Sequence, residues 1–306
     1  MADVELSVEV GGGLVLRNPV IAASGTYGYG VEYSGVGDPA ALGAVVVKGV
    51  SLQPSAGHPA PRMVETAAGM LNAIGLQNIG VERFLAEKLP WLREHAVTVV
   101  VNCWGNTVEE YREIVTALEG APGIAAVEIN ISSPNKREWG RIIATDPQRT
   151  AEVVGAARAA TRRPLWVKLS PNVTDVVEFA RVAEGEGADA LCVANTYVGM
   201  AVDLRGRRPA LSNVTGGLSG PAIKPLSLRA VYQVARVSKL PVIGVGGISS
   251  GEDALEYMVV GARAVQVGTA NLYDPAASGK ILKQIKRFLE EEGIADVKEL
   301  VGSLRA

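Results

Sequence analysis

An apolar segment near the middle of the chain ends in side chains that could bind or deprotonate a small molecule. Residues 128–135 read E-I-N-I-S-S-P-N, in which Asn130, Ser132, Ser133 and Asn135 carry amide and hydroxyl groups. Asparagine both donates and accepts hydrogen bonds, and a serine hydroxyl can act as a base when a neighbour accepts its proton. The same residues are common turn formers, so this segment taken alone favours an ordinary turn at the end of a strand.

The elements that would position these residues are predicted to form a (β/α)8 barrel. Short runs rich in Val, Ile and Ala recur along the chain, and such continuous apolar runs are typical of parallel strands buried on both faces. The eight predicted strands are 18–24, 44–50, 97–104, 125–132, 165–170, 189–196, 241–246 and 263–268. An open doubly wound sheet is the alternative, although no G-x-G-x-x-G follows the first strand.

Helical patterns lie between the predicted strands. They cover residues 81–94, 107–119, 147–161, 174–186, 226–238, 251–260 and 276–292. Several begin at residues that cap helices well, namely Asn106 or Thr107, Asp146, and Ser250. This alternation of strand and helix supports the barrel.

Two segments fall outside the repeat. Residues 4–17 predict a hairpin around Gly11–Gly13 that plugs the closed end of the barrel. Residues 197–224 form a long excursion after the sixth strand, and loops of that length in a compact domain are usually functional or disordered, so we expect it to cover the site. No linker or domain boundary is evident, so residues 1–306 are expected to form a single domain.

Polar residues and glycines gather at the predicted carboxyl ends of the strands, where a barrel of this kind places its active site. They are Ser24-Gly25, Lys48-Gly49, Asn102, Asn130, Ser132, Ser133, Lys168, Ser170, Asn195-Thr196, Gly246-Gly247 and Gly268-Thr269. Taken singly, each lysine could be salt-bridged and each glycine could be a plain turn. Their convergence on one rim favours a binding site.

The last two strands indicate what the site binds. Gly246-Gly247 and Gly268-Thr269 precede helices, and barrels often hold a phosphate group after strands seven and eight. Two strand-end lysines, several asparagines and no acidic metal cluster favour a planar, hydrogen-bonding ligand over a metal ion. Flavin mononucleotide (FMN) fits this description.

The composition of the chain argues against some classes of binding partner. The chain of 306 residues is 48% hydrophobic with a formal net charge of −2, which offers no electrostatic reason to expect nucleic acid or an anionic membrane. Cys103 and Cys192 lie in apolar runs without metal-ligand spacing, as expected for reduced thiols in the cytoplasm. We expect neither an export signal nor a membrane span.

Seven motifs, in order, make the chain resemble the dihydroorotate dehydrogenases, most closely class 1B. They are NPVIAASGTYGYG (18–30), VVVKGVSLQP (45–54), GMLNAIGLQN (69–78), EINISSPN (128–135), VKLSPNVTD (167–175), TGGLSGPAIKP (215–225) and GVGGI (244–248). The resemblance covers essentially the whole chain. It implies an FMN-binding barrel that oxidises dihydroorotate to orotate in pyrimidine biosynthesis.

The resemblance also assigns flavin contacts. Lys48 would lie between flavin and substrate, and Lys168 near the pyrimidine edge of the isoalloxazine, where a positive charge favours the reduced flavin anion. The other contacts implied for the ring are Ala23, Ser24, Gly25, Asn102 and Asn130. Those implied for the phosphate side are Gly220, Gly246, Gly247, Gly268 and Thr269.

The substrate site follows by the same resemblance. Together with Lys48, the residues implied are Asn72, Ile74, Gly75 and Leu76 of one loop, and Asn130, Asn135, Asn195 and Thr196. Ser133 would be the base that removes the C5 proton while hydride leaves C6 for flavin N5. Ser132 is less suited because it alternates with Asn130 on the strand itself.

The chain departs from class 1 at this base. Class 1 enzymes carry cysteine at the position of Ser133, whereas serine is typical of the membrane-associated class 2, whose N-terminal membrane-binding extension we do not expect in this chain. The stretch K-R-E-W-G-R-I-I-A after Asn135 also differs from the glycine-rich loop of the family.

The resemblance implies a partner. Class 1B catalytic chains pair with a subunit that carries FAD and a [2Fe–2S] cluster, and this chain has no cysteine set or NAD fingerprint of its own. A homodimer or heterotetramer is expected.

Three other functions remain open. One is a dihydropyrimidine dehydrogenase-like or other FMN barrel acting on a different ring. The second is a non-catalytic barrel that binds flavin and pyrimidine. The third is an aldolase or isomerase without flavin, in which Lys48 or Lys168 forms a Schiff base.

Overall fold

Eight parallel strands close into a barrel, which confirms the predicted (β/α)8 fold and excludes the open sheet. The computed structural model describes residues 4–133 and 143–305, so Asn135 and most of the stretch that follows it lie outside the described residues. The barrel strands are β3 (Val20–Ala22), β4 (Ala44–Val50), β7 (Val99–Cys103), β8 (Ile124–Asn130), β9 (Leu165–Lys168), β10 (Ala190–Val193), β15 (Val242–Val245) and β16 (Ala262–Val267). Each lies within or next to one predicted run.

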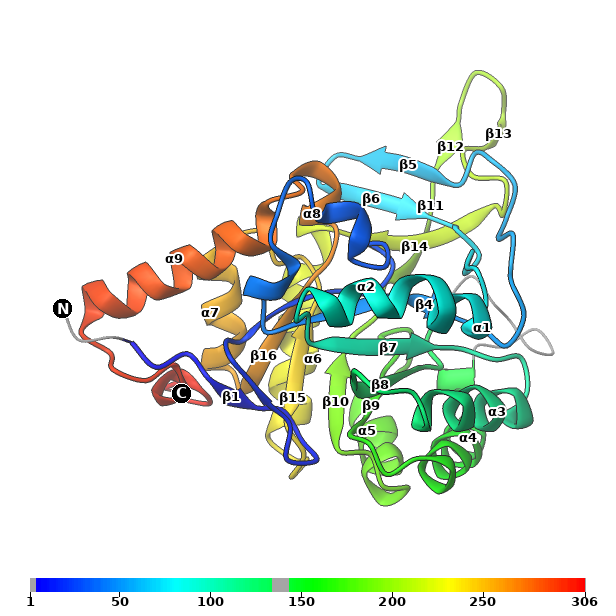
Figure 1. Cartoon of the computed structure of the whole chain (residues 1–306). Coiled ribbons are helices and arrows are strands. Elements are labelled where there is room, and N and C mark those ends of the chain that lie inside the picture. Colours follow the sequence, from blue (N-terminus) through cyan, green and yellow to red (C-terminus); the bar gives the residue numbers. More distant parts are fainter. Residues whose placement is uncertain (1–3, 134–142, 306) are drawn as a thin grey trace.

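Helices surround this barrel (Figure 1). The α-helices are α1 (Val81–Arg83), α2 (Leu89–Glu94), α3 (Val108–Glu119), α4 (Pro147–Ala160), α5 (Val176–Gly185), α6 (Lys224–Ala235), α7 (Gly251–Val259), α8 (Ala270–Tyr273) and α9 (Ala277–Glu292). The predicted helix 81–94 is α1 and α2 joined by the π-helical turn Phe84–Lys88. Short 3-10 turns occupy Val31–Tyr33, Pro39–Ala41, Ile143–Thr145, Pro221–Ile223 and Val297–Leu300.

The predicted caps begin three of these helices. The side chain of Thr107, not that of Asn106, accepts from the Glu110 N–H at the start of α3. Asp146 accepts from two backbone N–H groups at the start of α4. Ser250 and Asp253 form a reciprocal capping box at the start of α7.

The N-terminal hairpin lies at the end of the barrel away from the strand carboxyl ends. β1 (Val8–Glu9) pairs antiparallel with β2 (Val15–Leu16), as predicted around Gly11–Gly13. Glu9 Oε2 lies 3.2 Å from Nη1 of Arg263, which stands at the amino end of β16. Figure 1 shows β1 on the opposite side of the molecule from β5 and β6.

The long excursion after β10 forms strands of a second sheet and is not an irregular loop. β11 (Tyr197–Met200) and β14 (Thr215–Ser219) join β5 (Met63–Thr66) and β6 (Gly69–Asn72) in the antiparallel order β11-β14-β6-β5. These strands give little signal in the sequence because they are short, because β6, β11 and β14 contain glycine, and because β6 and β14 are far apart in the chain. This four-stranded sheet lies over the strand carboxyl ends (Figure 1).

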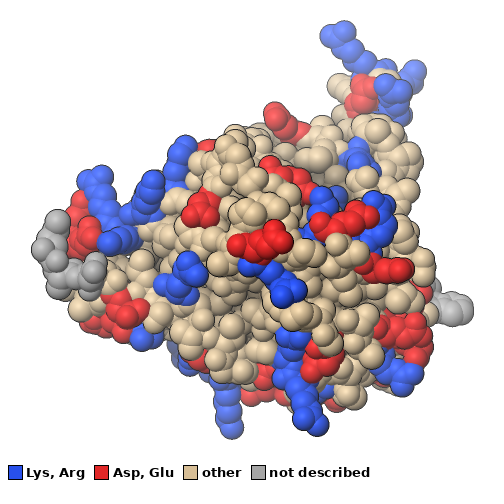
Figure 2. All heavy atoms as spheres, in the orientation of Figure 1, with Lys and Arg blue, Asp and Glu red and all other residues tan. Residues whose placement is uncertain are grey.

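A second hairpin projects from that sheet. It pairs β12 (Val202–Asp203) with β13 (Arg208–Pro209) and stands away from the body of the molecule in Figure 1. Figure 2 shows acidic and basic side chains interspersed over the face in view, with basic ones gathered on this hairpin. No helix within the described ranges combines the length and the apolar run needed to cross a bilayer.

Candidate active site

A cavity of about 300 Å³ opens at the carboxyl ends of the barrel strands, beneath the four-stranded sheet. Every residue of the described chain that the family resemblance assigned to flavin or substrate lines it, whereas Ser132 and Ser170 of the predicted rim are buried and do not. The residues that line it are Ala23, Ser24, Gly25, Lys48, Asn72, Ile74, Gly75, Leu76, Asn102, Asn130, Ser133, Lys168, Asn195, Thr196, Gly220, Gly246, Gly247, Gly268 and Thr269. Asn135 lies outside the described residues. Residues from distant parts of the sequence thus share one cavity.

The turn after β15 lines the cavity and packs so closely against neighbouring residues that it requires glycine at two positions. Gly246 and Gly247 have φ values of 132° and 69°. A Cβ atom on Gly247 would lie 2.7 Å from the backbone nitrogen of Lys224, so only glycine fits without movement. Asp253 already accepts from the N–H groups of Ser249 and Ser250 before α7. The anion site expected here is therefore the glycine turn rather than the terminus of α7.

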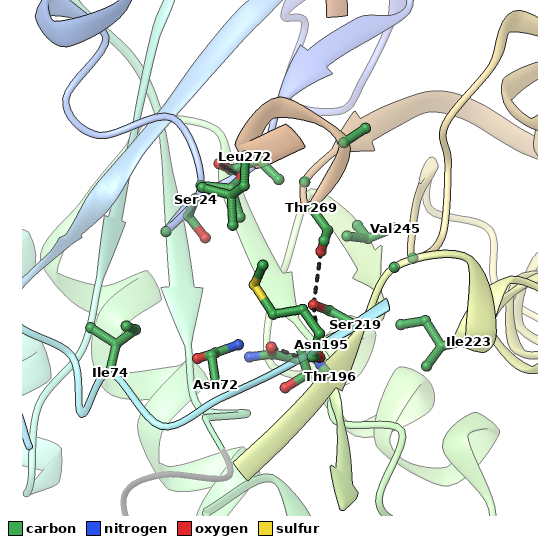
Figure 3. A pocket seen from close by; sticks show the side chains of 18 of the residues that line it. Ser24, Asn72, Ile74, Asn195, Thr196, Ser219, Ile223, Val245, Thr269 and Leu272 are labelled. Carbon is green, nitrogen blue, oxygen red and sulfur yellow. Dashed lines mark hydrogen bonds between the residues drawn. The ribbon is translucent and has the colours of Figure 1, made fainter. Parts of the chain in front are cut away.

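Across the cavity from Asn72, Thr269 Oγ1 donates to Ser219 Oγ at 2.8 Å, the contact drawn in Figure 3. This bond joins the turn after β16 to β14 of the covering sheet. The glycine turn of Gly246 and Gly247, called the glycine cradle below, lies beside these two hydroxyl groups. Together they have the polarity that a phosphate group needs, so the residues present fit FMN.

Lys48 stands half-buried at the carboxyl end of β4 and lines the cavity. Burial lowers the pKa of its ammonium group, the positive charge of Arg62 lowers it further, and Glu32 partly opposes both. This partly buried ammonium group would serve as the counter-charge of an anionic ligand in the cavity.

Lys168 is held within a buried polar cluster. Its Nζ donates to Ser24 Oγ at 3.3 Å and to Gln266 Oε1 at 3.2 Å, and lies 3.8 Å from Glu128 Oε1. Lys168 is 4% exposed, and Glu128 and Gln266 are wholly buried. Glu128 and Gln266 were not among the predicted site residues, although a polar residue inside an apolar strand was a signal for each.

A row of hydrogen bonds connects the amides along one side of the site. Asn130 Nδ2 donates to Asn102 Oδ1 at 3.3 Å, and Ser132 Oγ donates to Asn130 Oδ1 at 3.3 Å. Asn195 Nδ2 donates to Ser132 Oγ at 2.9 Å, while Asn195 Oδ1 accepts from the Thr196 N–H. These bonds fix the orientation of each amide toward the cavity.

The two serines of the opening motif have different surroundings. Ser133 lines the cavity, whereas Ser132 is wholly buried beside it and forms part of the hydrogen-bonded row. Of the two serines, only Ser133 is therefore placed to meet a molecule in the cavity, and its role as the base stays a prediction.

Asn72 reaches the cavity from β6 of the covering sheet, and its Nδ2 lies 3.5 Å from Gly217 O on β14. Ile74, Gly75 and Leu76 follow it along the cavity wall. Figure 3 shows Asn72, Asn195 and Thr196 in the lower part of the view, with Ser24 and Thr269 above them.

Other lining residues were not indicated by the sequence. Met63, Met70 and Ser219 come from the covering sheet, Ile223 from the 3-10 turn after it, and Leu272 and Tyr273 from α8. Cys103 and Cys192 are free and buried, and burial together with the Glu128 carboxylate raises the pKa of both thiols.

Comparison with known proteins agrees with this geometry. Residues 5–289 match the family model described as dihydroorotate dehydrogenase. A relative from Geobacter sulfurreducens is 57% identical over 304 residues, covering 99% of each chain, and is named dihydroorotate dehydrogenase B (NAD(+)), catalytic subunit. Proteins of the same name from Geotalea daltonii and Trichlorobacter lovleyi are 55% and 56% identical, covering 100% and 98% of each chain. This chain therefore belongs to the dihydroorotate dehydrogenase family.

Proposed function

We propose that residues 1–306 form a single FMN-binding domain that oxidises dihydroorotate to orotate in de novo pyrimidine biosynthesis. The observation that carries the proposal is one cavity in which a glycine cradle, two lysines, a row of amides and a serine come together. The family is flavin-dependent in general, and the names of the relatives support the reaction.

Two groups of residues would hold the cofactor. Gly220, Gly246, Gly247, Gly268 and Thr269 would surround its phosphate group. Its ring would contact Ala23, Ser24, Gly25, Lys48, Asn102, Asn130 and Lys168. Bound FMN would supply the hydride acceptor of the reaction.

The amide side chains would hold the pyrimidine ring. Orotate is a planar diamide with a carboxylate, so it needs several donors and acceptors and one counter-charge. Lys48 would supply the charge, and Asn72, Ile74, Gly75, Leu76, Asn130, Asn195 and Thr196 would supply the surrounding contacts. Leaving one such buried polar group unpaired costs about 1–3 kcal/mol.

Ser133 would take the C5 proton of dihydroorotate as the hydride leaves C6. A serine hydroxyl is a poor base at neutral pH, so the reaction requires a further proton acceptor next to Ser133. Ser132 is unsuited to that role because its hydroxyl already donates to Asn130 Oδ1.

We further propose that the chain works in the cytoplasm with a second subunit. The relatives are named as catalytic subunits of an NAD(+) enzyme, which supports a partner that carries FAD and a [2Fe–2S] cluster. The two cysteines of this chain are too few to ligate such a cluster. The catalytic chain would form a homodimer by itself, or a heterotetramer together with that subunit.

Ligand identification tests the proposal. Flavin released from the purified chain by denaturation should chromatograph as FMN, near one per chain, and orotate should perturb its visible spectrum more strongly than uracil. Tighter binding of uracil would favour a dihydropyrimidine dehydrogenase-like enzyme. A colourless protein that is trapped on Lys48 or Lys168 by a carbonyl compound and borohydride would favour the aldolase or isomerase.

A further inference from the structure

A carboxylate lies inside the barrel below the cavity, and the reaction described above gives it no role. Glu128 is wholly buried and is absent from the cavity wall. It stands on β8 two residues before Asn130, so both side chains point to the same side of the strand. Burying a carboxylate is costly unless it is paired and fully hydrogen-bonded, which makes its partners informative.

The first partner leads to the substrate side of the cavity. Asn102 Nδ2 donates to Glu128 Oε1 at 2.6 Å. The amide oxygen of Asn102 is thereby turned the other way, where it accepts from Asn130 Nδ2. The row of bonds through Ser132 to Asn195 starts from this amide.

The second partner leads to Lys168. Gln266 Nε2 donates to Glu128 Oε2 at 2.5 Å, and Gln266 Oε1 accepts from Lys168 Nζ at 3.2 Å. β8 and β16 are separated by three strands on either side of the closed barrel, so this bond crosses its interior. The Lys168 ammonium group is also 3.8 Å from Glu128 Oε1.

These two bonds determine which way both amides face. An amide can rotate by 180° with almost no change in shape, so packing alone does not fix its direction. An ionised carboxylate only accepts, which forces the NH2 groups of Asn102 and Gln266 toward Glu128. Their oxygens must then point outward, to Asn130 and to Lys168.

We propose that Glu128 is a positioning residue whose carboxylate sets the direction of two hydrogen-bonded arms, one ending at the pyrimidine site and the other at Lys168. This inference rests on the proposed function, because it takes the cavity to hold flavin and orotate. Glu128 touches neither ligand and acts through Asn102 and Gln266.

A substitution of equal shape tests this role. Glu128→Gln leaves only one acceptor where two NH2 groups meet, so Asn102 or Gln266 must rotate or lose its bond. In the flavin-loaded variant we expect the orotate dissociation constant, measured by flavin spectral titration, to rise about 3- to 10-fold, the effect of one or two disturbed hydrogen bonds. Glu87→Gln is the matched control, because Glu87 pairs with Arg83 at the surface.

Moving the carboxylate across the barrel should reverse the defect. In the double variant Glu128→Gln, Gln266→Glu, the new amide can accept from Asn102 and donate to the new carboxylate, which in turn accepts from Lys168. The bond between positions 128 and 266 reverses, but the directions of the bonds to Asn102 and Lys168 and the net charge are kept, so orotate affinity should return to within about twofold of the parent. Gln266→Glu alone brings two carboxylates together, and should load less flavin than the double variant does.

Three results would overturn the role of Glu128. One is a flavin-loaded Glu128→Gln variant that binds orotate as tightly as the parent does. That result is expected if the carboxylate serves only stability or charge balance. Another is a double variant that binds orotate no better than Glu128→Gln. The third result applies if Glu128→Gln does not fold. It is a double variant that loads no more flavin than Gln266→Glu alone. A parent protein without flavin or orotate binding would instead refute the proposed function.

Discussion

Asn195 Nδ2 lies 2.9 Å from Ser132 Oγ and donates a hydrogen bond to it across the wall of the cavity. Ser132 in turn donates to Asn130, so its hydroxyl is occupied in holding two amides in place. Ser133, the next residue, lines the cavity itself. Two adjacent serines therefore have different surroundings, one bonded between two amides and one lining the cavity.

Replacement of Ser133 tests its role as the base. Ser133→Ala should keep its flavin and bind orotate, while flavin reduction by dihydroorotate slows by roughly 10²-fold or more, since a general base typically contributes that much. Anaerobic stopped-flow absorbance measures the reduction rate. An alanine variant that reduces its flavin as fast as the parent would return Ser133 to an ordinary turn residue.

The matched variant Ser133→Cys keeps a proton acceptor at the same place. A thiol has a reference pKa of about 8.5 and ionises far more readily than a serine hydroxyl. This variant should stay active, with its pH profile displaced toward lower pH. A cysteine variant as slow as Ser133→Ala at every pH would contradict the assignment.

A bulky residue at Gly247 should expel the flavin. The left-handed backbone and the 2.7 Å approach of a Cβ atom to Lys224 mean that Gly247→Leu disrupts the turn proposed to hold the phosphate. The absorbance ratio of flavin to protein measures occupancy. Gly279→Leu is the control, because a Cβ atom on Gly279 meets nothing within 4 Å. Full flavin occupancy in Gly247→Leu would show that the phosphate site lies elsewhere.

Alanine at Asn72, Asn130 or Asn195 should weaken orotate binding. Each lost hydrogen bond to a neutral group should cost about 0.5–1.5 kcal/mol in binding free energy. The loss should be largest for Asn130, whose removal also takes a donor from Asn102 and an acceptor from Ser132. Spectral titration gives the dissociation constants, with exposed Asn106→Ala as the control. Unchanged titrations in all three variants would rule out the pyrimidine site.

Lys48 should impose an alkaline limit on orotate binding. Burial lowers its pKa, so the ammonium group loses its proton below the ordinary lysine value of about 10.4, and the attraction for an anion is lost with it. Titrations from pH 7 to 10.5 should therefore show weakening affinity. In Lys48→Met the affinity should be lower at pH 7, and the difference from the parent should vanish as pH rises. Ionisation of orotate affects both proteins equally, so that difference reports Lys48.

The lowered pKa of Lys48 also affects the folding stability of the protein. The unfolded chain binds a proton at Lys48 more tightly than the folded chain does, so the contribution of Lys48 to folding stability rises as pH rises between its folded and unfolded pKa values. At pH 7 the flavin-free Lys48→Met protein should be at least as stable as the flavin-free parent. A clearly lower melting temperature for the variant would mean that Lys48 is a structural ion-pair residue.

The barrel was predictable because its signal is local and repeated. Each buried parallel strand is a continuous apolar run, and Thr107, Asp146 and Ser250 mark where helices begin. The site followed from the fold, since parallel strands bring their carboxyl ends to one rim.

The covering sheet and the interior cluster were not predictable in this way. β14 reads T-G-G-L-S and pairs with β6 about 145 positions earlier, so neither propensity nor local pattern identifies the pair. Glu128 and Gln266 come from strands on opposite sides of the barrel, and only the closed barrel shows that their side chains meet.

The most direct test of the central claim is the visible spectrum of the purified chain, recorded before and after anaerobic addition of dihydroorotate. We expect a flavin spectrum that bleaches as orotate forms in equal amount, with no other component present. Dihydrouracil should bleach it far less. A flavin that stays oxidised in excess dihydroorotate, or a protein that carries no flavin, would refute the proposed oxidation.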